Sequence, residues 1–469
     1  MFIGLQFILA VCIGVFIILI SAILFWRPGF NLLTDAFVKR LMKDPYPENI
    51  GEMYNVFTKV GVQNVFESDL RSTNGEPLQR PFGSPKHLSS WDKLLFNPVY
   101  FTRKPTVESA AFNTKVTIGP KAKRPLEIDM PIMIAGMNYG GGLSLNAKIA
   151  LAKGADLVKT ATGTGAGPFL PEERKHVKRL IIQYHRGSWS KEEAVLRQAD
   201  AIEINLGYGS YGPAPVIWRN KDLSPEFRDY MKLDSNEDLI EEATLPNVKN
   251  GAELTKLVQH LRQLTNGAPI GIKFGATHYL EQELEVFTKA GIDFLSIAGG
   301  EAGIHYGPGI LTDDVGLPTL PALCRTVNFL KQHGFQNKIS LIISGGLVTP
   351  GHFLKALALG ADAVAIGTVA ILAMAHIQVT KVLPWKPLTE LVFENGKSKG
   401  KLSIDDAAMS IANFLKSCNE EIMLAIGCMG WASLKELSSS DLCSTSAEIA
   451  SMAGVDHCLY PPKGYQIKK

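Results

Sequence analysis

The sequence predicts an α/β protein built around a (β/α)8 (TIM) barrel, with an N-terminal transmembrane helix and a helical C-terminal extension. Three observations support this prediction: an uncharged apolar run at the N-terminus, eight short apolar segments separated by helical stretches, and a long helical pattern near the C-terminus. With 469 residues, 46% of them hydrophobic and 20% charged, the chain can bury a large core. The expected parts are residues 1–27 (transmembrane anchor), 28–125 (cap or linker), 126–385 (barrel) and 386–469 (helical extension).

The N-terminal run from Phe2 to Trp26 contains no charged residue, and a helix needs only about 20 apolar residues to cross a bilayer. A cleaved signal peptide is the alternative, but its apolar region is usually about 7–15 residues long and follows a basic start. No Lys or Arg precedes this run, whereas Arg27, Lys39 and Arg40 follow it. Because basic residues favour the cytoplasmic side, we expect a single-pass membrane protein with its catalytic domain in the cytoplasm.

Charge and cysteine content exclude two classes of function. The formal net charge is +3, and no Lys/Arg run is dense enough to follow a phosphate backbone, so we expect no nucleic-acid partner. No cysteine pair has the spacing of a zinc site or a CxxC motif, which favours buried thiols in a reducing compartment and predicts no metal site. The six cysteines are Cys12, Cys324, Cys418, Cys428, Cys443 and Cys458.

Eight segments rich in apolar or β-branched residues alternate with helical patterns, which indicates a parallel sheet covered on both faces. Eight such units over about 250 residues match the size of a closed barrel. A doubly wound open sheet is the alternative. The expected strands begin at Ile132, Ala155, Leu180, Ala201, Ile270, Phe294, Leu341 and Ala363.

One long insertion, residues 208–250, follows the fourth expected strand, on the face where barrel enzymes carry their active sites. Loops of this length are usually functional or disordered. The pattern SIDDAAMSIANFLKSCNEEIMLAIGCMG, beginning at Ser403, predicts a long helix, and a second helix is expected after the serine-rich turn near residue 440. These helices are expected to pack on the barrel or on a partner.

Glycine-tipped loops follow the seventh and eighth expected strands. Ser344, Gly345 and Gly346 form the first loop, and Gly367 and Thr368 form the second. In barrels these two loops often bind a phosphate, because glycine lets backbone N–H groups approach an anion and the next helix adds its positive end. The alternative is that these glycines only form tight turns.

Six segments between about Pro131 and Met374 resemble the FMN-binding domain of glutamate synthase, and more closely the stand-alone proteins that lack the glutaminase half. They are PIMIAGMNYGGGLSLNAKIALAKGA, KTATGTGAG, LIIQYHRGSW, IGIKFGA, IAGGEAG and LIISGGLVTPGHFLKALALGADAVAIGT, in this order. The resemblance implies FMN as the cofactor and, nominally, glutamate synthase activity on CH–NH2 or related donors.

The resemblance also assigns roles to individual residues. It places the FMN phosphate on residues 344–346 and 367–368, and it implies that Lys273 lies near flavin N1 and C2=O. A cation there stabilises the negative charge of the reduced ring. The remaining cofactor residues it implies are Ala135, Gly136 and Met137, through their backbone at the ring, and Thr160, Thr162 and Gln183, at its polar edge.

The sequence departs from the family at three places. No amidotransferase precedes the barrel, and the segment Ala373–Trp385 contains no cysteine where the family has three, so no 3Fe–4S cluster is expected. Thr164, Asn205 and Tyr208 stand where the family has a Glu, a Lys and a Gln. Losing a charge-assisted bond to a substrate carboxylate costs about 1.5–3 kcal/mol, so we expect a substrate other than 2-oxoglutarate.

The small-molecule substrate is expected to contact Arg186, which matches a family arginine, together with Asn205 and Tyr208. Lys273, Glu301 and His305 are the candidate catalytic residues. Glu301 stands at the position of a family aspartate. An imidazole has an ordinary pKa of about 6.5, which suits His305 as the base that removes a substrate proton. The electron donor or acceptor is not identified by the sequence.

Two other functions stay open. The first is a different flavin-dependent dehydrogenase or oxidase on the same barrel. A hydroxy-acid oxidase would carry His beside Arg in a late loop, which His305 lacks, and an IMP-dehydrogenase-like enzyme would need a cysteine nearer than Cys324. The second is a non-catalytic flavin-binding scaffold at the membrane.

Overall fold

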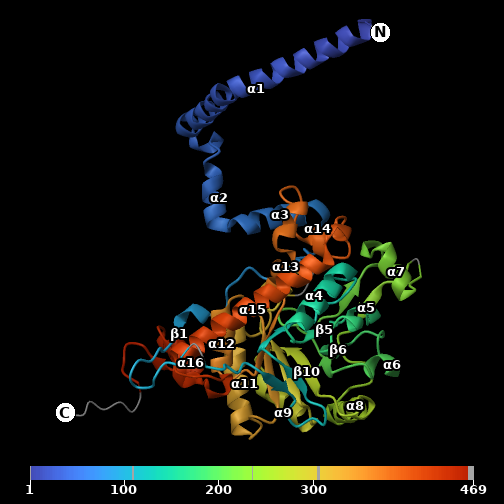
Figure 1. Ribbon diagram of the computed structural model, residues 1–469, viewed down its shortest axis with the longest axis vertical. Helices are drawn as coiled ribbons and strands as arrows, with labels where there is room; N and C mark the ends of the chain where they lie inside the picture. Colours follow the sequence, from blue (N-terminus) through green and yellow to red (C-terminus); the bar gives the residue numbers. More distant parts are fainter. Residues whose placement is uncertain (1, 108–109, 235, 304–306, 463–469) are drawn as a thin grey trace, which may run out of the picture. The chain divides into compact units, whose positions relative to one another are not determined.

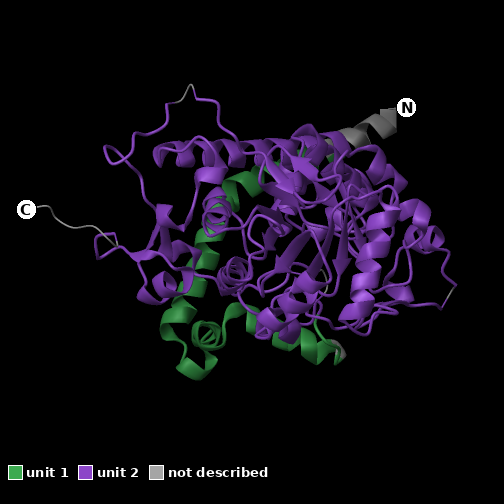
Figure 2. Ribbon diagram, turned by 90° about the horizontal axis from the view of Figure 1, so that it is seen from below, with its two compact units in different colours: residues 1–78 green, residues 79–469 purple. Residues whose placement is uncertain are grey.

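The computed structural model describes residues 2–107, 110–234, 236–303 and 307–462. The chain forms two compact units, Met1–Leu78 and Gln79–Lys469 (Figure 2). The first unit is helical and consists of α1 (Phe2–Lys43), η1 (Tyr46–Glu48), α2 (Glu52–Val60) and α3 (Val62–Asn74).

Helix α1 is long and apolar enough to cross a membrane. Its segment Ile13–Lys43 contains an 18-residue window with a mean hydropathy of 2.0, and none of that window is buried. The helix continues through Pro28, beyond the end expected for the anchor. Its length and its composition are those of a helix that can cross a membrane.

The second unit is built around eight parallel strands in the order β4-β13-β12-β11-β10-β7-β6-β5 (Figure 1). Strands β4 and β5 lie at the two ends of this order, and the Ile134 amide donates to the Ala161 carbonyl at 3.0 Å between them. The Thr160 hydroxyl also donates to the Ile132 carbonyl at 2.6 Å. The sheet is therefore a nearly closed barrel, as the sequence predicts. The strands are β4 (Ile132–Ile134), β5 (Thr162–Gly163), β6 (Leu180–Tyr184), β7 (Ala201–Asn205), β10 (Ile270–Gly275), β11 (Phe294–Ala298), β12 (Ser340–Ser344) and β13 (Ala363–Ile366).

The second strand was expected to begin at Ala155, and this expectation is wrong. Helix α4 (Leu145–Leu157) continues through that position, since its buried apolar positions keep helical spacing as far as Ala155. The chain then turns at Lys159, which has a φ of 56°. The strand itself is the two-residue β5, which is too short to give a periodic signal.

Helices cover the outside of the barrel, and a small antiparallel hairpin packs against its interior. The hairpin of β2 (Val116–Ile118) and β3 (Leu126–Ile128) packs Ile118 and Ile128 against inward-facing residues of the strands. The helices are α5 (Pro171–Lys175), α6 (Glu193–Leu196), α8 (Gly251–Leu264), α9 (Leu280–Lys289), α10 (Gly309–Asp314), α11 (Thr319–Gln332), α12 (Pro350–Ala358) and α13 (Thr368–Ala375).

The insertion after the fourth strand is ordered over its described residues. It contains β8 (Val216–Trp218), η3 (Asn220–Asp222), α7 (Pro225–Met231) and β9 (Leu239–Glu241). Strands β8 and β9 pair antiparallel. Trp218, Phe227 and Leu239 of the insertion form a separate apolar cluster with Tyr139 and Trp189 of the barrel loops, so the insertion has a small core of its own.

The C-terminal part is mainly helical, as expected, and also adds strands. Strand β14 pairs antiparallel with β1 and parallel with β15, and α15 packs along α4. The elements of this sheet and of the C-terminal part are η2 (Trp91–Lys93), β1 (Leu94–Phe96), η4 (His376–Lys381), α14 (Thr389–Val392), η5 (Lys399–Lys401), α15 (Ile404–Cys428), η6 (Leu434–Glu436), η7 (Ser439–Asp441), β14 (Leu442–Ser444), α16 (Ala447–Ala453) and β15 (Asp456–His457).

The contact between α4 and α15 gives a stability prediction. A Cβ atom at Gly154 would overlap the Cγ2 of Ile411 and lie 3.0 Å from the Ala408 carbonyl oxygen. Gly154→Ala should therefore lower the free energy of unfolding by about 1–3 kcal/mol, measured by thermal unfolding of the detergent-solubilised protein. Gly351→Ala in α12 is the matched control, because its Cβ meets only the Thr349 hydroxyl at 3.8 Å. An equal change in the free energy of unfolding in both variants would contradict close packing of α15 against α4.

Candidate active site

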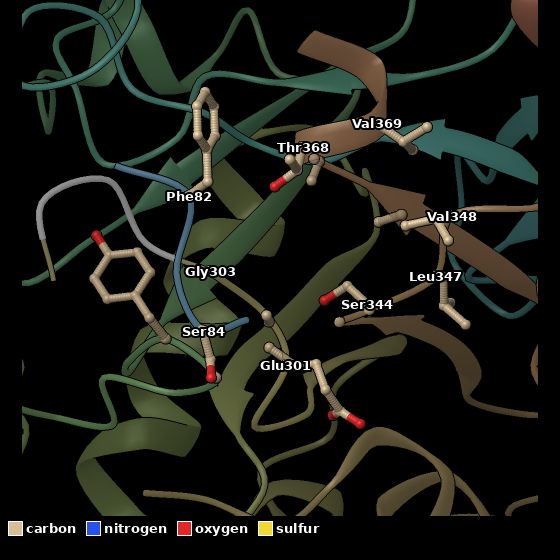
Figure 3. A pocket seen from close by; sticks show the side chains of 18 of the residues that line it. Phe82, Ser84, Glu301, Gly303, Ser344, Leu347, Val348, Thr368 and Val369 are labelled. Atoms are coloured by element: carbon tan, nitrogen blue, oxygen red, sulfur yellow. The ribbon is translucent and has the colours of Figure 1, made fainter. Parts of the chain in front are cut away.

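A cavity of about 690 Å³ opens at the carboxyl end of the barrel strands. Its walls come from the loops after β4, β11, β12 and β13, from the insertion, and from residues 80–92, which we call the strap. Figure 3 shows strap residues Phe82 and Ser84 on one side, and Ser344, Val348 and Val369 on the other. A volume of this size is typical of a small-molecule or cofactor site.

The strap is fastened to the loop region around α10. The Arg80 amide donates to the Gly307 carbonyl at 3.0 Å, and the Ser84 hydroxyl donates to the Asp313 carboxylate at 2.6 Å. Lys86 pairs with Asp314 at 2.7 Å. These contacts join residues more than 200 positions apart, and they place the strap over the cavity.

Most of the residues expected to form the site line this one cavity. They are Ala135, Gly136, Met137, Tyr208, Lys273, Glu301, Ser344, Gly345, Gly346, Gly367 and Thr368. Thr160, Thr162, Gln183, Arg186 and Asn205 are buried in or beside the barrel but do not line it. His305 lies outside the described residues.

The two glycine loops fit a phosphate group. Gly345 and Gly346 have φ angles of 115° and 64°, and a Cβ at Gly346 would lie 2.9 Å from the Cβ of Glu301. A Cβ at Gly367 would meet nothing within 4 Å, so space is left at this loop. Helix α13 begins at Thr368, directly after the second loop, and its first N–H groups are suited to an anion.

The loop after β4 is held from below by a buried ion pair that sequence reasoning missed. The Lys148 amino group donates to the carbonyls of Met137 at 2.7 Å and Gly163 at 2.9 Å, and it lies 2.8 Å from Glu173. Burial raises the pKa of the Glu173 carboxyl, and Lys148 opposes that shift. A lysine on the apolar face of the predicted helix NAKIALAKGAD was the signal that could have revealed this pair.

A second buried polar chain runs from the cavity into the barrel. The Lys273 amino group lies 4.0 Å from the Glu203 carboxylate, which accepts a hydrogen bond from the Gln183 amide nitrogen at 2.6 Å. The Gln183 amide oxygen accepts in turn from Asn205 at 3.1 Å. Gln183 and Asn205 thus bond to protein groups, and Lys273 is the member of the chain that lines the cavity. Glu203 was also missed, although it lies opposite Gln183 in the strand register.

Arg186 fastens the insertion to the barrel. Its guanidinium donates to the Pro213 carbonyl at 2.6 Å and lies 3.4 Å from Glu241, with both side chains fully buried. The Tyr208 hydroxyl donates to the same carboxylate at 2.7 Å. Burial and the neighbouring Glu241 raise the Tyr208 pKa well above its usual value, so Tyr208 reaches the cavity as a neutral phenol.

Glu301 lies between the cavity and the start of α11. One carboxylate oxygen accepts from the Thr319 amide at 2.8 Å and from the Thr319 hydroxyl at 2.7 Å. The other oxygen is buried and has no hydrogen-bond partner among the described residues. Figure 3 shows the carboxylate turned away from Thr368. The Thr164 hydroxyl accepts a hydrogen bond from the backbone N–H of Gln183 at 3.0 Å.

Comparison with known proteins gives consistent matches. The family model for the conserved region in glutamate synthase matches residues 87–432. A glutamate synthase large subunit-like protein of Rhizobium meliloti is 31% identical over 408 residues, which cover 82% of this chain and 92% of that protein. An archaeal-type glutamate synthase (NADPH) of Dehalococcoides mccartyi is 26% identical over 388 residues, which cover 78% and 77%. Among solved structures, a flavocytochrome b2 mutant with pyruvate bound aligns with a TM-score of 0.49 and 14% identity, over 82% of this chain and 86% of that one.

The buried pair below the cavity wall can be tested by a double-mutant cycle. Lys148→Met leaves the Glu173 carboxylate buried without its partner, and should lower the free energy of unfolding by about 3–5 kcal/mol at neutral pH. Lys148→Met/Glu173→Leu should lose clearly less. Thermal unfolding of the wild type, Lys148→Met, Glu173→Leu and the double variant measures the coupling energy. Losses of unfolding free energy that add up in the double variant would contradict the coupling.

The same variant should depend on pH in a defined direction. Without Lys148 the pKa of Glu173 rises further above its ordinary value of 4.5. The folded state then binds a proton that the unfolded state releases, so the penalty is absent below pH 4.5 and full above the folded pKa. Lys148→Met should therefore be least destabilised, relative to the wild type, at the acid end of the range.

Proposed function

Because the chain belongs to the glutamate synthase family, we propose that it is an FMN-dependent oxidoreductase that binds FMN in the cavity of its barrel. Family membership supports FMN as the cofactor, as the sequence predicts. The observation that carries the proposal is that two glycine loops, the second of them at the start of α13, line one cavity together with Lys273. FMN would supply electron transfer to or from the substrate.

The cavity residues divide into a phosphate end and a ring end. Residues 344–346 and 367–368 would bind the phosphate through backbone N–H groups. The backbone of residues 135–137 would face the ring, held in place by Lys148. Lys273 would lie near the ring atoms that become negative on reduction, and a fixed cation there stabilises that charge. Glu203, 4.0 Å from Lys273, holds the amino group on that side of the barrel.

The substrate is proposed to differ from 2-oxoglutarate. Cations beside both carboxylates would favour a dicarboxylate, whereas Arg186 donates to the Pro213 carbonyl and pairs with Glu241. Among the described residues, the basic side chains that line the cavity are Lys86, His87, Lys273 and His352, and Lys86 pairs with Asp314. We propose that the family's reaction type, oxidation or reduction at a carbon–nitrogen bond, is retained on a different carbon skeleton, with Tyr208 and Asn138 near the substrate.

Glu301 and His305 remain proposed catalytic residues. The free oxygen of Glu301 and the imidazole of His305 are the groups on the loop after β11 that could accept a substrate proton. Exchange of each residue, with flavin reduction by a substrate followed in a stopped-flow instrument, would test this assignment. Unchanged reduction rates in Glu301→Gln and His305→Gln would remove both from the chemistry.

Attachment to a membrane through α1 is also proposed. The support is the apolar segment of this helix, and Arg27, Lys39 and Arg40 after the uncharged run favour a cytoplasmic position for the barrel. A reporter enzyme that works only outside the cytoplasm, fused after Lys469, should be inactive. An active reporter would contradict this orientation.

The direct test of the cofactor is the visible spectrum of the purified, detergent-solubilised protein. We expect the two absorption bands of an oxidised flavin, release of FMN on denaturation as identified by mass, and no iron. A colourless protein that cannot be loaded with FMN would contradict the proposal and favour a non-catalytic scaffold.

Lys273 gives a sharper test of the ring position. Loss of a charge-assisted interaction of about 1.5–3 kcal/mol with the reduced ring corresponds to a two-electron potential about 30–65 mV more negative. Lys273→Met should show this shift in a spectroelectrochemical titration. Lys289→Met is the control, because Lys289 is exposed on α9 and pairs with Glu285. A potential equal to that of the wild type would place the flavin ring away from Lys273.

A further inference from the structure

The last turn of α13 and the segment that leads from it to α14, orange in Figure 1, carry exposed apolar side chains. We define the Trp385 patch as Leu372, Ile377, Leu383 and Trp385. Trp385 is 91% exposed and Ile377 is 69% exposed, while Leu372 and Leu383 are about half exposed. A tryptophan side chain that is almost fully exposed is unusual, because tryptophan is normally highly buried.

The patch is presented by an anchored turn. The Gln378 side chain is buried, donates to the Ser403 carbonyl at 3.1 Å and accepts from the Ser403 amide at 2.8 Å. Val382 is also buried, and the Leu383 amide donates to the Val379 carbonyl at 3.0 Å. Ile377 lies on η4 (His376–Lys381), and Leu383 follows two residues after its end.

The segment that carries the patch is rich in lysine: residues 372–401 contain five lysines and two glutamates. Lys381 bonds to the Gln378 amide oxygen and the Lys401 carbonyl, both at 2.8 Å, and these neutral partners leave its charge in place. Lys386 and Lys397 are exposed, and Lys386 pairs with the partly buried Glu390 at 3.4 Å. The surroundings of the patch therefore carry a net positive charge.

We propose that the Trp385 patch inserts into the headgroup region of a membrane that contains anionic phospholipid. Exposed Trp with Leu and Ile suits the membrane–water interface, and lysines around them suit anionic headgroups. Helix α1 on the same chain is apolar enough to span a bilayer, which would keep a lipid surface at high effective concentration. The proposal rests on the membrane attachment proposed above.

A protein partner fits the patch less well than lipid. Stable protein interfaces use about 20–30 residues on each side, whereas the patch has four apolar side chains set among lysines. The patch also lies at the far end of α13, whose first residues Thr368, Val369 and Ile371 line the cavity. An eight-residue helix is about 12 Å long, so lipid contact would bring the cavity rim close to the membrane surface.

The test uses the full chain in nanodiscs whose lipids carry bromine, which quenches nearby tryptophan fluorescence. The six tryptophans are Trp26 on α1, Trp385, and four others within the second unit, at positions 91, 189, 218 and 431. In Trp26→Phe we expect a quenched component with anionic bromolipid, and its loss in Trp26→Phe/Trp385→Phe. Equal quenching in these two variants, or none in either, would overturn the proposal.

The design separates the patch from the membrane span. The difference between the wild type and Trp26→Phe reports insertion of α1, so a protein that loses this difference fails at the anchor and not at the patch. Lys386→Glu/Lys397→Glu should weaken the Trp385 component in anionic discs, whereas Lys416→Glu, on an exposed site of α15, should leave it unchanged. Full quenching of Trp385 in Lys386→Glu/Lys397→Glu would overturn the proposed role of the lysines in lipid binding. An unchanged flavin spectrum verifies the fold of every variant.

Discussion

The buried amino group of Lys148 connects the ends of β4 and β5, and the cavity wall depends on this connection. Strand β5 is only two residues long, so β4 and β5 share few backbone bonds at the place where the barrel closes. Lys148 bridges this place by bonding to the Met137 carbonyl, which follows β4, and to the Gly163 carbonyl, at the end of β5. A buried ammonium is costly unless it is paired, and Glu173 provides that pairing at 2.8 Å. Helix α4 carries Lys148, and α15 packs on α4 at Gly154, so the C-terminal extension supports the cavity wall formed by the loop after β4.

Buried charge also organises the insertion. Arg186 donates to the Pro213 carbonyl and pairs with Glu241, and Glu241 accepts a hydrogen bond from the Tyr208 hydroxyl. The insertion could not bury Glu241 without these partners. One buried cluster therefore joins the insertion to the loops after β6 and β7.

Most of the fold was predictable because its signals are local. Seven of the eight strands are short apolar runs bounded by helical patterns, and both phosphate loops follow strands in the sequence itself. Strand β5 was misplaced because the apolar end of α4 has the same composition as a buried strand. Lys148, Glu203 and the strap have partners that come from distant elements, such as Asp313 for Ser84, and a single sequence does not reveal such contacts.

The segment Ala373–Trp385 connects the cofactor site to the surface. The resemblance places a 3Fe–4S cluster here in the family, whereas this segment has no cysteine and carries Trp385 and Leu383 exposed. Without thiolates the segment offers no route for electrons through a cluster. The start of α13 lines the cavity together with the strap, and the chain continues from this helix to the exposed Trp385. One short stretch of chain therefore links the cavity wall to an exposed apolar surface.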